Sequence, residues 1–442
     1  MLAGRKVLIA GLGKSGVAAA RLTRRHGAKV AVSDARDGEK QRAAVRELAP
    51  LLETSELGGH SATLFAWADL IVSSPGVPLA LPIFQQARER GVEIIGEVEL
   101  AFRLLAAPVI GITGTKGKST TTALVGEMLI ADGRRTFVGG NLGTPLAEAL
   151  LAEVPPEIAV VELSSFQLET IVELRPSVAA LLNLAPDHQD RYASHDDYVA
   201  AKRRLFARQW PTDAAVLNAD DAGVMEQSFA VRSRLFTFGG RDSNAWFAGD
   251  VLHLRLDGAP ETYDAAKYLP PGKHNRENLA AAALMARLAG ASPAAIQQTI
   301  ETFRGLAHRL ETLAEISGVL YVNDSKATTP GAVRTSLRAM NRPVILILGG
   351  RDKGGDWSTI SVDVVSRARL VFAYGEAAAR IAAGLAEIPI RIVGPFAEAL
   401  AQARAAARPG EAVLLSPGCA SFDQFANFEE RGEAMRQWVE RL

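Results

Sequence analysis

The residues best suited to chemistry form a glycine-rich loop, Gly111–Thr121, which reads GITGTKGKSTT. An apolar run, Pro108–Ile112, precedes the loop, and a helix-like stretch, Ala123–Ile130, follows it. Glycines let the backbone N–H groups of such a loop approach phosphate oxygens, and the amino terminus of a helix adds a positive dipole. Lys118 would reach the β- and γ-phosphates, and Ser119 would bind a magnesium ion. Because isoleucine replaces the first glycine of the strict P-loop pattern, an ordinary strand-to-helix turn is the alternative to a nucleoside triphosphate site.

A second glycine motif follows the first predicted strand, Lys6–Ala10. Gly11, Gly13 and Gly16 have the spacing GxGxxG, and Asp34 ends the next predicted strand. This is the dinucleotide-binding pattern, with an acid placed to bind a ribose hydroxyl. The spacing alone leaves three alternatives open: a dinucleotide, another nucleotide or sugar nucleotide, and a structural turn.

Further polar residues follow predicted strands in the middle of the chain, where ligand sites of open α/β sheets are found. Glu162 ends a strand of the buried type, and Asp187 and His188 follow another. A carboxylate beside a triphosphate loop suggests a magnesium ligand, with a solvated loop acid as the alternative. His188 is either a ligand or a structural histidine. Lys202 lies in the run AAKRR, so its neighbours predict one charge on a solvated helix face.

Three strand ends in the last third of the chain carry small, basic and hydroxyl side chains. They are Asn323–Thr328, Gly349–Lys353 and Ser416–Phe422. Such groups suit a small anionic ligand. Cys419 lies in the last of them, and we expect a buried small residue because no activating partner for a nucleophile is evident.

The elements that position these residues restart an alternating strand–helix pattern three times. Short apolar runs alternating with helices predict parallel sheets with helices on both faces. We therefore expect an α/β protein of three domains, over residues 1–96, 97–303 and 304–442. Trp246–Leu256 is expected to form an antiparallel hairpin at the edge of the middle sheet, and Ser292 and Pro293 to begin a helix.

Composition excludes several classes of protein. The 442 residues include 49 Lys+Arg and 49 Asp+Glu, so the formal net charge is zero, and no basic stripe suggests nucleic-acid binding. The single cysteine excludes an intramolecular disulfide and a multi-cysteine metal site. No run suggests a signal peptide or a membrane span. We expect a soluble cytoplasmic protein.

These motifs together resemble the Mur ligase family of bacterial cell-wall synthesis over essentially the whole chain. The family signal consists of Thr113–Ser119, Glu162, Asp187-His188, Lys202, His274-Asn275, His308-Arg309 and Asn323–Lys326. A second signal, Ser416–Phe425 with Asn427–Glu429, is similar to the branch of the family that adds D-glutamate.

The resemblance implies an ATP-dependent amide ligase that adds D-glutamate to UDP-N-acetylmuramoyl-L-alanine in peptidoglycan precursor synthesis. In this family a substrate carboxylate takes the γ-phosphoryl group of ATP, the incoming amine attacks the acyl phosphate, and a tetrahedral intermediate loses phosphate. The resemblance further implies a Rossmann-like N-terminal domain for the UDP substrate, a central P-loop-type ATPase domain with a mostly parallel sheet, and a Rossmann-like C-terminal domain for the amino acid. The expected partners are small molecules, with no nucleic acid or membrane, and the expected state is a monomer.

The resemblance also assigns roles to individual residues. Those implied in catalysis are Lys118, Glu162, His188, Lys202 and Asn141. Those implied to bind ATP are Gly114, Thr115, Lys116, Gly117, Lys118, Ser119, Thr120, Asn275, Asn278, Arg309 and Asp324. Those implied to bind the UDP substrate are Ser15, Asp34, Ala35, Arg36, Gly76 and Asn141. Those implied to bind D-glutamate are His188, Lys326, Thr328, Lys353, Ser421 and Phe428.

The implied cofactors are ATP and two Mg²⁺ ions held by Ser119, Glu162, His188 and Lys202. Lys202 resembles the lysine of the family that carbon dioxide converts into an anionic carbamate, and this reverses its interpretation as a solvated charge. Two positions depart from the family pattern. Lys116 stands where asparagine is usual and adds a charge near the phosphates, and Ala35 supplies no hydroxyl to the uridine site.

Three other functions remain open at this point. Another Mur-type ligase would take a different amino acid or a folate-like acceptor, which the Ser416–Phe425 motif argues against. An NAD-dependent oxidoreductase would explain the first glycine motif and leave the Gly111 loop unexplained. A non-catalytic nucleotide-gated binding protein would have no need of Lys202 or His188.

Overall fold

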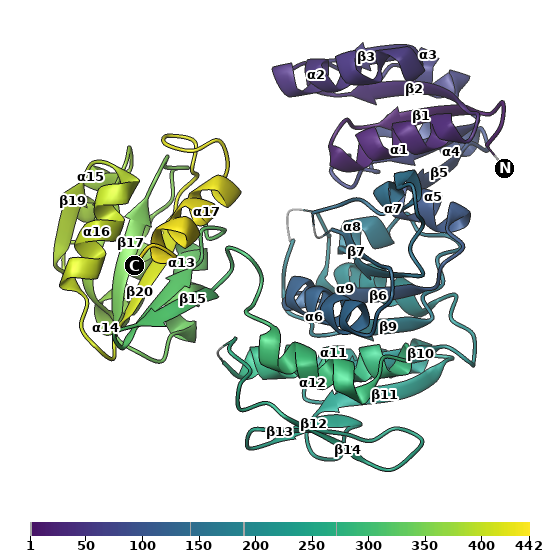
Figure 1. The fold of residues 1–442 in the computed structure, drawn as a ribbon. Coiled ribbons are helices and arrows are strands. Elements are labelled where there is room, and N and C mark those ends of the chain that lie inside the picture. Colours follow the sequence, from purple (N-terminus) through teal and green to yellow (C-terminus); the bar gives the residue numbers. More distant parts are fainter. Residues whose placement is uncertain (1, 142, 189–190, 271) are drawn as a thin grey trace. The chain divides into compact units, whose positions relative to one another are not determined.

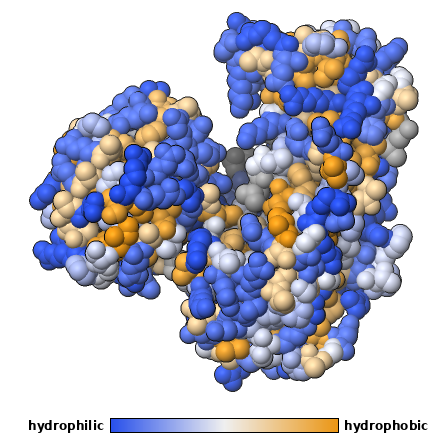
Figure 2. All heavy atoms as spheres, in the orientation of Figure 1, coloured by the Kyte–Doolittle hydropathy of each residue, from blue (hydrophilic) through white to orange (hydrophobic). Residues whose placement is uncertain are grey.

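The computed structural model describes residues 2–141, 143–188, 191–270 and 272–442. The chain forms two compact units, Met1–Ala266 with Glu277–Ile300, and Lys267–Arg276 with Glu301–Leu442. Figure 1 shows three sheets along the chain, two in the first unit and one in the second. Figure 2 shows hydrophilic side chains over much of the visible surface, with hydrophobic ones scattered between them. Among the described residues, no helix is both long and apolar enough to cross a membrane.

The first sheet is fully parallel, as the alternating pattern predicted. Its strands, in spatial order, are β3 (Leu52–Leu57), β2 (Lys29–Asp34), β1 (Lys6–Ala10), β4 (Leu70–Ser73) and β5 (Glu93–Gly96). Its helices are α1 (Lys14–Arg25), α2 (Glu39–Leu48), α3 (Ala62–Trp67) and α4 (Pro82–Glu89). Successive side chains of β1 point to opposite faces. Val7 and Ile9 pack with α1 and α2, whereas Leu8 and Ala10 pack with α3 and α4.

The second sheet has nine strands and carries the phosphate loop. In spatial order they are β14 (Glu261–Asp264), β13 (Val251–Leu254), β12 (Ala245–Ala248), β11 (Arg234–Gly239), β10 (Ala214–Asn218), β9 (Val178–Leu181), β6 (Val109–Thr113), β8 (Ile158–Glu162) and β7 (Thr136–Gly140). The strands from β7 to β12 are parallel, and β12, β13 and β14 are antiparallel, which confirms the predicted edge hairpin.

Most helices of this middle segment connect its strands. The helices are α5 (Glu97–Leu104), α6 (Lys118–Ala131), α7 (Ala147–Leu151), α8 (Ser165–Leu168), α9 (His195–Arg203), α10 (Ala222–Met225), α11 (Lys273–Leu288) and α12 (Pro293–Thr302). Of these, α5 precedes the first strand, and α11 and α12 follow the last one. The predicted start of α12 is confirmed, because the Ala295 amide donates to the Ser292 hydroxyl oxygen at 3.3 Å.

Buried carboxylates of α5, the helix that directly follows β5 of the first sheet, attach this end of the first sheet to loops of the second. Glu99 of α5 accepts hydrogen bonds from the backbone amides of Val172, Glu173 and Leu174 at 2.8–3.0 Å. Glu97, also on α5, accepts one from the Ala147 amide at 2.6 Å. Because both side chains are fully or almost fully buried, these contacts hold the two sheets in one unit.

The third sheet forms the core of the second unit. In spatial order its strands are β15 (Glu311–Ile316), β16 (Val319–Asn323), β20 (Ala412–Gly418), β17 (Val344–Gly349), β18 (Ala368–Tyr374) and β19 (Ile390–Val393), of which only β15 is antiparallel to its neighbour. Its helices are α13 (Pro330–Ala339), α14 (Ser361–Arg367), α15 (Ala378–Gly384), α16 (Phe396–Ala406) and α17 (Phe428–Val439). The first three pack on one face of the sheet and the last two on the other.

Candidate functional site

The phosphate loop joins the end of β6 to the start of α6, as its sequence predicted. Gly117 directly precedes α6 with a φ of +82°, a conformation that favours glycine. A Cβ atom at Gly117 would lie 2.3 Å from the side-chain oxygen of Asn278. The loop can therefore keep its shape against the buried Asn278 only with glycine at this position.

The side chain of Lys118 folds back over the loop. Its Nζ atom donates hydrogen bonds to the carbonyl oxygens of Gly114, at 2.9 Å, and Thr115, at 3.0 Å. A nucleotide phosphate bound at a strand-to-helix loop would contact an ammonium group that lies across the mouth of that loop. The Lys118 ammonium thus lies across the loop, and its contact with a phosphate stays a prediction.

Asn183, which belongs to no recognised sequence motif, holds the other side of the loop. Its side chain accepts a hydrogen bond from the Lys116 amide at 2.7 Å and donates one to the Lys116 carbonyl at 2.9 Å. The Lys116 side chain itself is exposed. The additional charge at this position therefore lies on the outer side of the loop, while the backbone is fixed by Asn183.

Glu162 and Asn141 meet at the carboxyl ends of the neighbouring strands β8 and β7. The Asn141 amide donates to Glu162 Oε1 at 2.7 Å, and Glu162 is 2% exposed. Its other oxygen, Oε2, is buried and has no hydrogen-bond partner in the part of the chain that the structure describes. A buried carboxylate oxygen without a partner is costly unless a cation or a donor completes it. This oxygen therefore fits a magnesium ligand.

The neighbouring groups also fit a magnesium–nucleotide site. Ser119, in the first turn of α6, is almost buried. Within the described ranges, no three His, Cys, Asp or Glu side chains gather as a metal cage. Magnesium bound with a nucleotide needs only one or two protein ligands, since phosphate oxygens and water supply the others. The donor set of one hydroxyl and one carboxylate agrees with that pattern.

Lys202 lies against the phosphate loop rather than in solvent. It is 1% exposed, and its Nζ donates to the Gly114 carbonyl at 2.8 Å and the Thr113 hydroxyl at 3.4 Å. The ammonium also lies 4.7 Å from the centre of the Tyr198 ring. Burial is the main cause that lowers the pKa of Lys202 to about 7, and the nearby positive charge of Lys118 lowers it further. The expectation of a solvated charge is wrong, because this face of α9 packs onto the loop.

His188 follows β9 in a left-handed backbone conformation, with a φ of +52°. Its ring centre lies 4.7 Å from that of Phe166, and its Nε2 lies 3.8 Å from the Asp187 carboxylate. The side chain is 42% exposed. Non-glycine residues with positive φ are uncommon and concentrate at functional sites, so the backbone here agrees with a ligand role without assigning one.

Of the six residues expected to bind the UDP substrate, all but Asn141 line one cavity of about 540 Å³ in the first sheet. They are Ser15, Asp34, Ala35, Arg36 and Gly76. Asp34 accepts from the Leu12 amide at 2.8 Å and the Arg36 amide at 2.9 Å, so it also shapes the glycine loop. We call this space the nucleoside cavity.

His60 also lines the nucleoside cavity and was missed by sequence reasoning. Its Nδ1 lies 2.9 Å from the Ser33 hydroxyl, and burial lowers the pKa of the imidazole. Burial thus favours the neutral form of the ring. A lone histidine in a loop after β3 carries no sequence signal that would have identified it.

The second unit brings together most of the residues expected to bind D-glutamate. Lys353 Nζ donates to the Thr328 hydroxyl at 3.2 Å, and the Lys326 ammonium lies 5.8 Å from the Phe428 ring centre. Both lysines are exposed. Ser421 is buried directly after Ala420, which pairs with Arg351 in the loop that carries Lys353. The other expected contact, His188, belongs to the first unit.

Three residues expected to bind ATP differ in their surroundings. Asp324 is 4% exposed and accepts from the hydroxyls of Ser336 and Ser416. Burial raises the pKa of Asp324 to about 6, although these donors lower it. Through these hydrogen bonds Asp324 also organises the loop that carries Lys326. Arg309 is exposed, whereas Asn275 is almost buried in the first turn of α11.

Arg431 of α17 was not identified from the sequence and is fully buried. It donates to the hydroxyl and carbonyl of Ser325, at 2.9 and 2.8 Å, and to the carbonyl of Cys419 at 3.2 Å. The guanidinium thus joins the loop before Lys326 to the loop before Ser421. Cys419 is buried as expected, and burial raises the pKa of its thiol to about 12.

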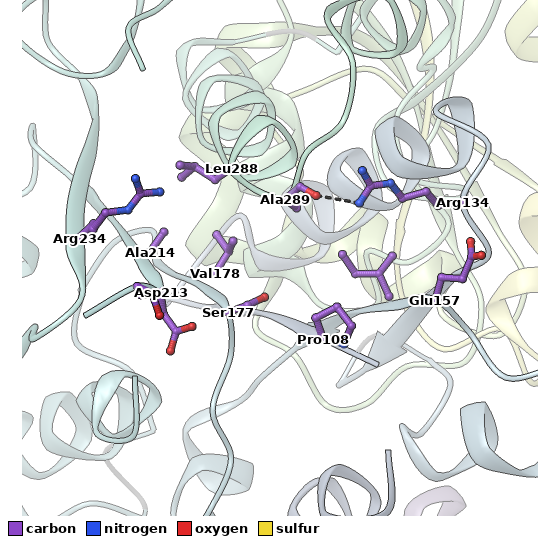
Figure 3. Close-up of a pocket in the computed structure, with 12 residues that line it drawn as sticks. Pro108, Arg134, Glu157, Ser177, Val178, Asp213, Ala214, Arg234, Leu288 and Ala289 are labelled. Atoms are coloured by element: carbon purple, nitrogen blue, oxygen red, sulfur yellow. Dashed lines mark hydrogen bonds between the residues drawn. The ribbon is translucent and has the colours of Figure 1, made fainter. Parts of the chain in front are cut away.

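Another cavity, of about 610 Å³, opens at the amino-terminal ends of β8, β9 and β10 (Figure 3). The phosphate loop lies at the opposite, carboxyl-terminal ends of the strands of this sheet. Arg134 lines it and donates to the Ala289 carbonyl at 2.7 Å and the Gly290 carbonyl at 2.9 Å. This arginine therefore caps the carboxyl end of α11. Because ligand sites of open α/β sheets lie at the other edge, we do not place the active site here.

Each third of the chain matches a known family domain. The matches are the Mur ligase MurD-like N-terminal domain over residues 5–96, the Mur ligase middle domain over residues 112–286, and the Mur ligase glutamate ligase domain over residues 308–419. The chain belongs to the Mur ligase family. The family prediction and the predicted three-domain α/β fold are thereby confirmed.

Curated relatives match the chain over nearly its whole length. A UDP-N-acetylmuramoylalanine--D-glutamate ligase of Anaeromyxobacter dehalogenans is 48% identical, covering 99% of this chain and 97% of the relative. The enzyme of the same name from Myxococcus xanthus is 46% identical, covering 100% of this chain and 99% of the relative. The family uses ATP and Mg²⁺, which agrees with the donor set around Glu162.

Solved structures of Mur ligases have the same fold. UDP-N-acetylmuramate-alanine ligase from Thermotoga maritima superposes with a TM-score of 0.58 at 19% identity, covering 99% of both chains. MurF from Acinetobacter baumannii gives 0.60 at 18% identity, covering 98% of this chain and 93% of the other. At this identity the likeness concerns the fold alone.

Proposed function

We propose that this Mur ligase joins D-glutamate to UDP-N-acetylmuramoyl-L-alanine, with conversion of ATP to ADP and phosphate. The observation that carries the proposal is the 46–48% identity, over the whole chain, to ligases of that name. Two features of the structure support it. A nucleoside cavity lies in the first sheet, and in the second unit the Lys353 ammonium lies beside the Thr328 hydroxyl.

The reaction has two chemical steps. A carboxylate oxygen of the nucleotide substrate attacks the γ-phosphorus of ATP, the bond to the β–γ bridging oxygen breaks, and ADP leaves. The amine of D-glutamate then attacks the acyl carbon, loses a proton, and expels phosphate to leave the amide. A carboxylate is a poor electrophile and phosphate is a good leaving group, so positioning and charge stabilisation carry the catalysis.

The residues that the family resemblance assigns to the nucleotide would bind and orient ATP. The loop residues Gly114, Thr115, Lys116, Gly117 and Thr120 would surround the phosphates, and Lys118 would offset the charge on the transferred group. Asn275, Asn278, Arg309 and Asp324 would contact the remainder of the nucleotide. Ser119 and Glu162 would hold a magnesium ion, which when bound polarises the phosphoryl oxygens. Asn141 would fix Glu162 and contact the carboxyl group being activated.

Lys202 would act as a carbamate. Its burial against the phosphate loop supports this role, because a neutral amine in a dry site can add carbon dioxide and lose a proton to give an anionic carbamate. Together with His188, the carbamate would hold a second magnesium ion. To react, the ammonium that now donates to Gly114 would first lose a proton, and the carbamate would then carry its negative charge on oxygen atoms suited to hold a metal ion.

The amino-acid site would use Lys326 and Lys353 to bind the carboxylates of D-glutamate, helped by His188, Thr328, Ser421 and Phe428. The UDP group would enter the nucleoside cavity at Ser15, Asp34, Ala35, Arg36 and Gly76. We further propose that the enzyme acts as a monomer in the cytoplasm, where its small-molecule substrates are made. No nucleic acid or membrane enters the reaction.

A phosphate-release assay tests the function. The purified chain is incubated with ATP, Mg²⁺, UDP-N-acetylmuramoyl-L-alanine and a panel of amino acids, among them L-alanine, L-lysine, meso-diaminopimelate and both enantiomers of glutamate. Turnover is expected with D-glutamate only. Turnover with another amino acid in its place, or none with any, would contradict the proposal. A parallel reaction with NAD and no ATP tests the oxidoreductase alternative and is expected to give no reduction.

A further inference from the structure

The nucleoside cavity adjoins a second cavity in the same unit. This second cavity has a volume of about 490 Å³, and its wall shares Gly13 and Lys14 with that of the nucleoside cavity. Its opposite wall is formed by Gly143, Thr144 and Pro145, in the loop that follows Asn141. The second cavity therefore extends from the nucleoside cavity to the loop that contains Gly143, Thr144 and Pro145.

Basic side chains line this second cavity. Arg21 contacts Glu47 and lies 3.9 Å from Glu148, so both acids of the wall face this arginine. Lys14, in the first turn of α1, and Lys40, in the first turn of α2, are exposed and line the same cavity. Throughout the described ranges, neither lysine has a hydrogen bond or an ion pair. The cavity thus keeps two ammonium groups available for an anion.

We propose that Lys14 and Lys40 bind the diphosphate of the nucleotide substrate and set the affinity for nucleoside diphosphates over nucleosides. This inference rests on the proposed function. It adds two residues to those that are expected to bind the UDP group. Each phosphoryl group of a diphosphate diester carries a negative charge, so two ammonium groups match it. Lysine suits this task because its ammonium binds phosphate as a point charge from a flexible stem.

The other cations nearby are less suited to this role. Arg21 is already compensated by Glu47 and Glu148. Arg36 lies at the nucleoside end, with its Nε 3.6 Å from the Asp34 carboxylate. Lys14 borders both cavities, which is where the first phosphoryl group after a nucleoside would lie. Lys40 borders only the second, which suits the following phosphoryl group.

Titration calorimetry with UDP and uridine tests the proposal on the full chain. The variants are Lys14→Met, Lys40→Met and the double variant, and the matched control is Lys29→Met, which changes an exposed lysine of β2 that lines neither cavity. The Kd for UDP is expected to rise about 10-fold in each single variant and further in the double variant, as expected for loss of charge-assisted contacts. The Kd for uridine, measured by displacement, is expected to stay within about twofold.

Salt adds a second measurement. The affinity of the unmodified chain for UDP should fall with ionic strength, and the double variant should show a shallower dependence. An unchanged Kd for UDP in the double variant would overturn the inference. Equal weakening of UDP and uridine would also overturn it, because the substitutions would then act on the nucleoside cavity. The phosphate-release assay on the unmodified chain separates this failure from that of the proposed function.

Discussion

The Lys202 ammonium donates a hydrogen bond to the carbonyl oxygen of Gly114, 2.8 Å away, in the middle of the phosphate loop. The two residues lie 88 positions apart in the sequence. This contact places an almost fully buried lysine beside the cluster of Lys118 and Glu162. It also shows that α9 packs against the phosphate loop rather than lying in solvent.

Replacing Lys202 should separate catalysis from nucleotide binding. Lys202→Ala is expected to reduce ligation at least about 100-fold, the usual scale for loss of one preorganised charged group. The Kd for ATP should change less than about threefold, because the loop keeps Lys118 and its backbone donors. Phosphate release and ATP titration measure the two effects.

Arg203→Ala is the matched control for this substitution. Arg203 is the next residue of α9, and its guanidinium faces the Phe229 ring at 5.1 Å rather than the phosphate loop. The Arg203→Ala variant should retain ligase activity. Carbon-13 NMR with labelled bicarbonate should show a carbamate signal in the unmodified chain and none in Lys202→Ala. A fully active Lys202→Ala would remove the carbamate from the mechanism.

The charge of Lys116 should raise the affinity for ATP. Lys116→Asn preserves the backbone contacts with Asn183 and removes one exposed positive charge near the phosphates. We expect the Kd for ATP to rise about 3- to 10-fold at low ionic strength, with the difference shrinking as salt screens the charge. Lys29→Asn, far from the loop in the first sheet, should leave the Kd unchanged. Equal affinities at low salt would show that Lys116 does not face the nucleotide.

The buried Glu97 should make stability depend on pH. Burial raises the pKa of Glu97 to about 7, although the hydrogen bond from the Ala147 amide opposes this rise. The other carboxylate oxygen, Oε2, has no hydrogen-bond partner among the described residues. With a folded pKa above the unfolded value of 4.5, its contribution to stability is present below pH 4.5 and is lost as pH rises through about 7.

Glu97→Gln should therefore stabilise the protein at high pH. Glutamine can still accept from Ala147 without carrying a buried charge, so at pH 8 the free energy of unfolding should rise by about 2 kcal/mol. The gain should disappear near pH 4. Urea unfolding at both pH values measures it, with Glu127→Gln, an exposed position on α6, as the control. A pH-independent difference would contradict the linkage to Glu97.

Two exposed lysines of the second unit should determine the affinity for D-glutamate. Lys326→Met and Lys353→Met are each expected to raise the KM for D-glutamate about 10- to 100-fold, since each would remove one charge-assisted contact to a carboxylate. The KM for UDP-N-acetylmuramoyl-L-alanine should change little. Arg391→Met, an exposed position on β19, is the control. Parallel increases of both KM values would indicate a general structural defect instead.

Local sequence signals predicted much of the fold. The phosphate loop, the edge hairpin of β12 and β13 and the start of α12 at Pro293 depend on glycine, alternation and capping within a few residues. The resemblance to the family drew attention to Lys202, which no local signal had identified. Arg431 and Asn183 were missed because an arginine on a helix and an asparagine after a strand are ordinary in sequence, and their roles come from partners 106 and 67 positions away.

The sequence by itself determined the kind of chemistry: a phosphate loop, an acid at the end of β8 and small polar loops at strand ends. These follow from residue types over short spans, where backbone geometry leaves few choices. The tertiary structure alone decided which charges lose water and which keep it. It buries Lys202 and Glu97 while leaving Lys14, Lys40 and Lys116 exposed. Burial depends on what packs against a side chain from distant segments, so no local pattern could have ranked these charges.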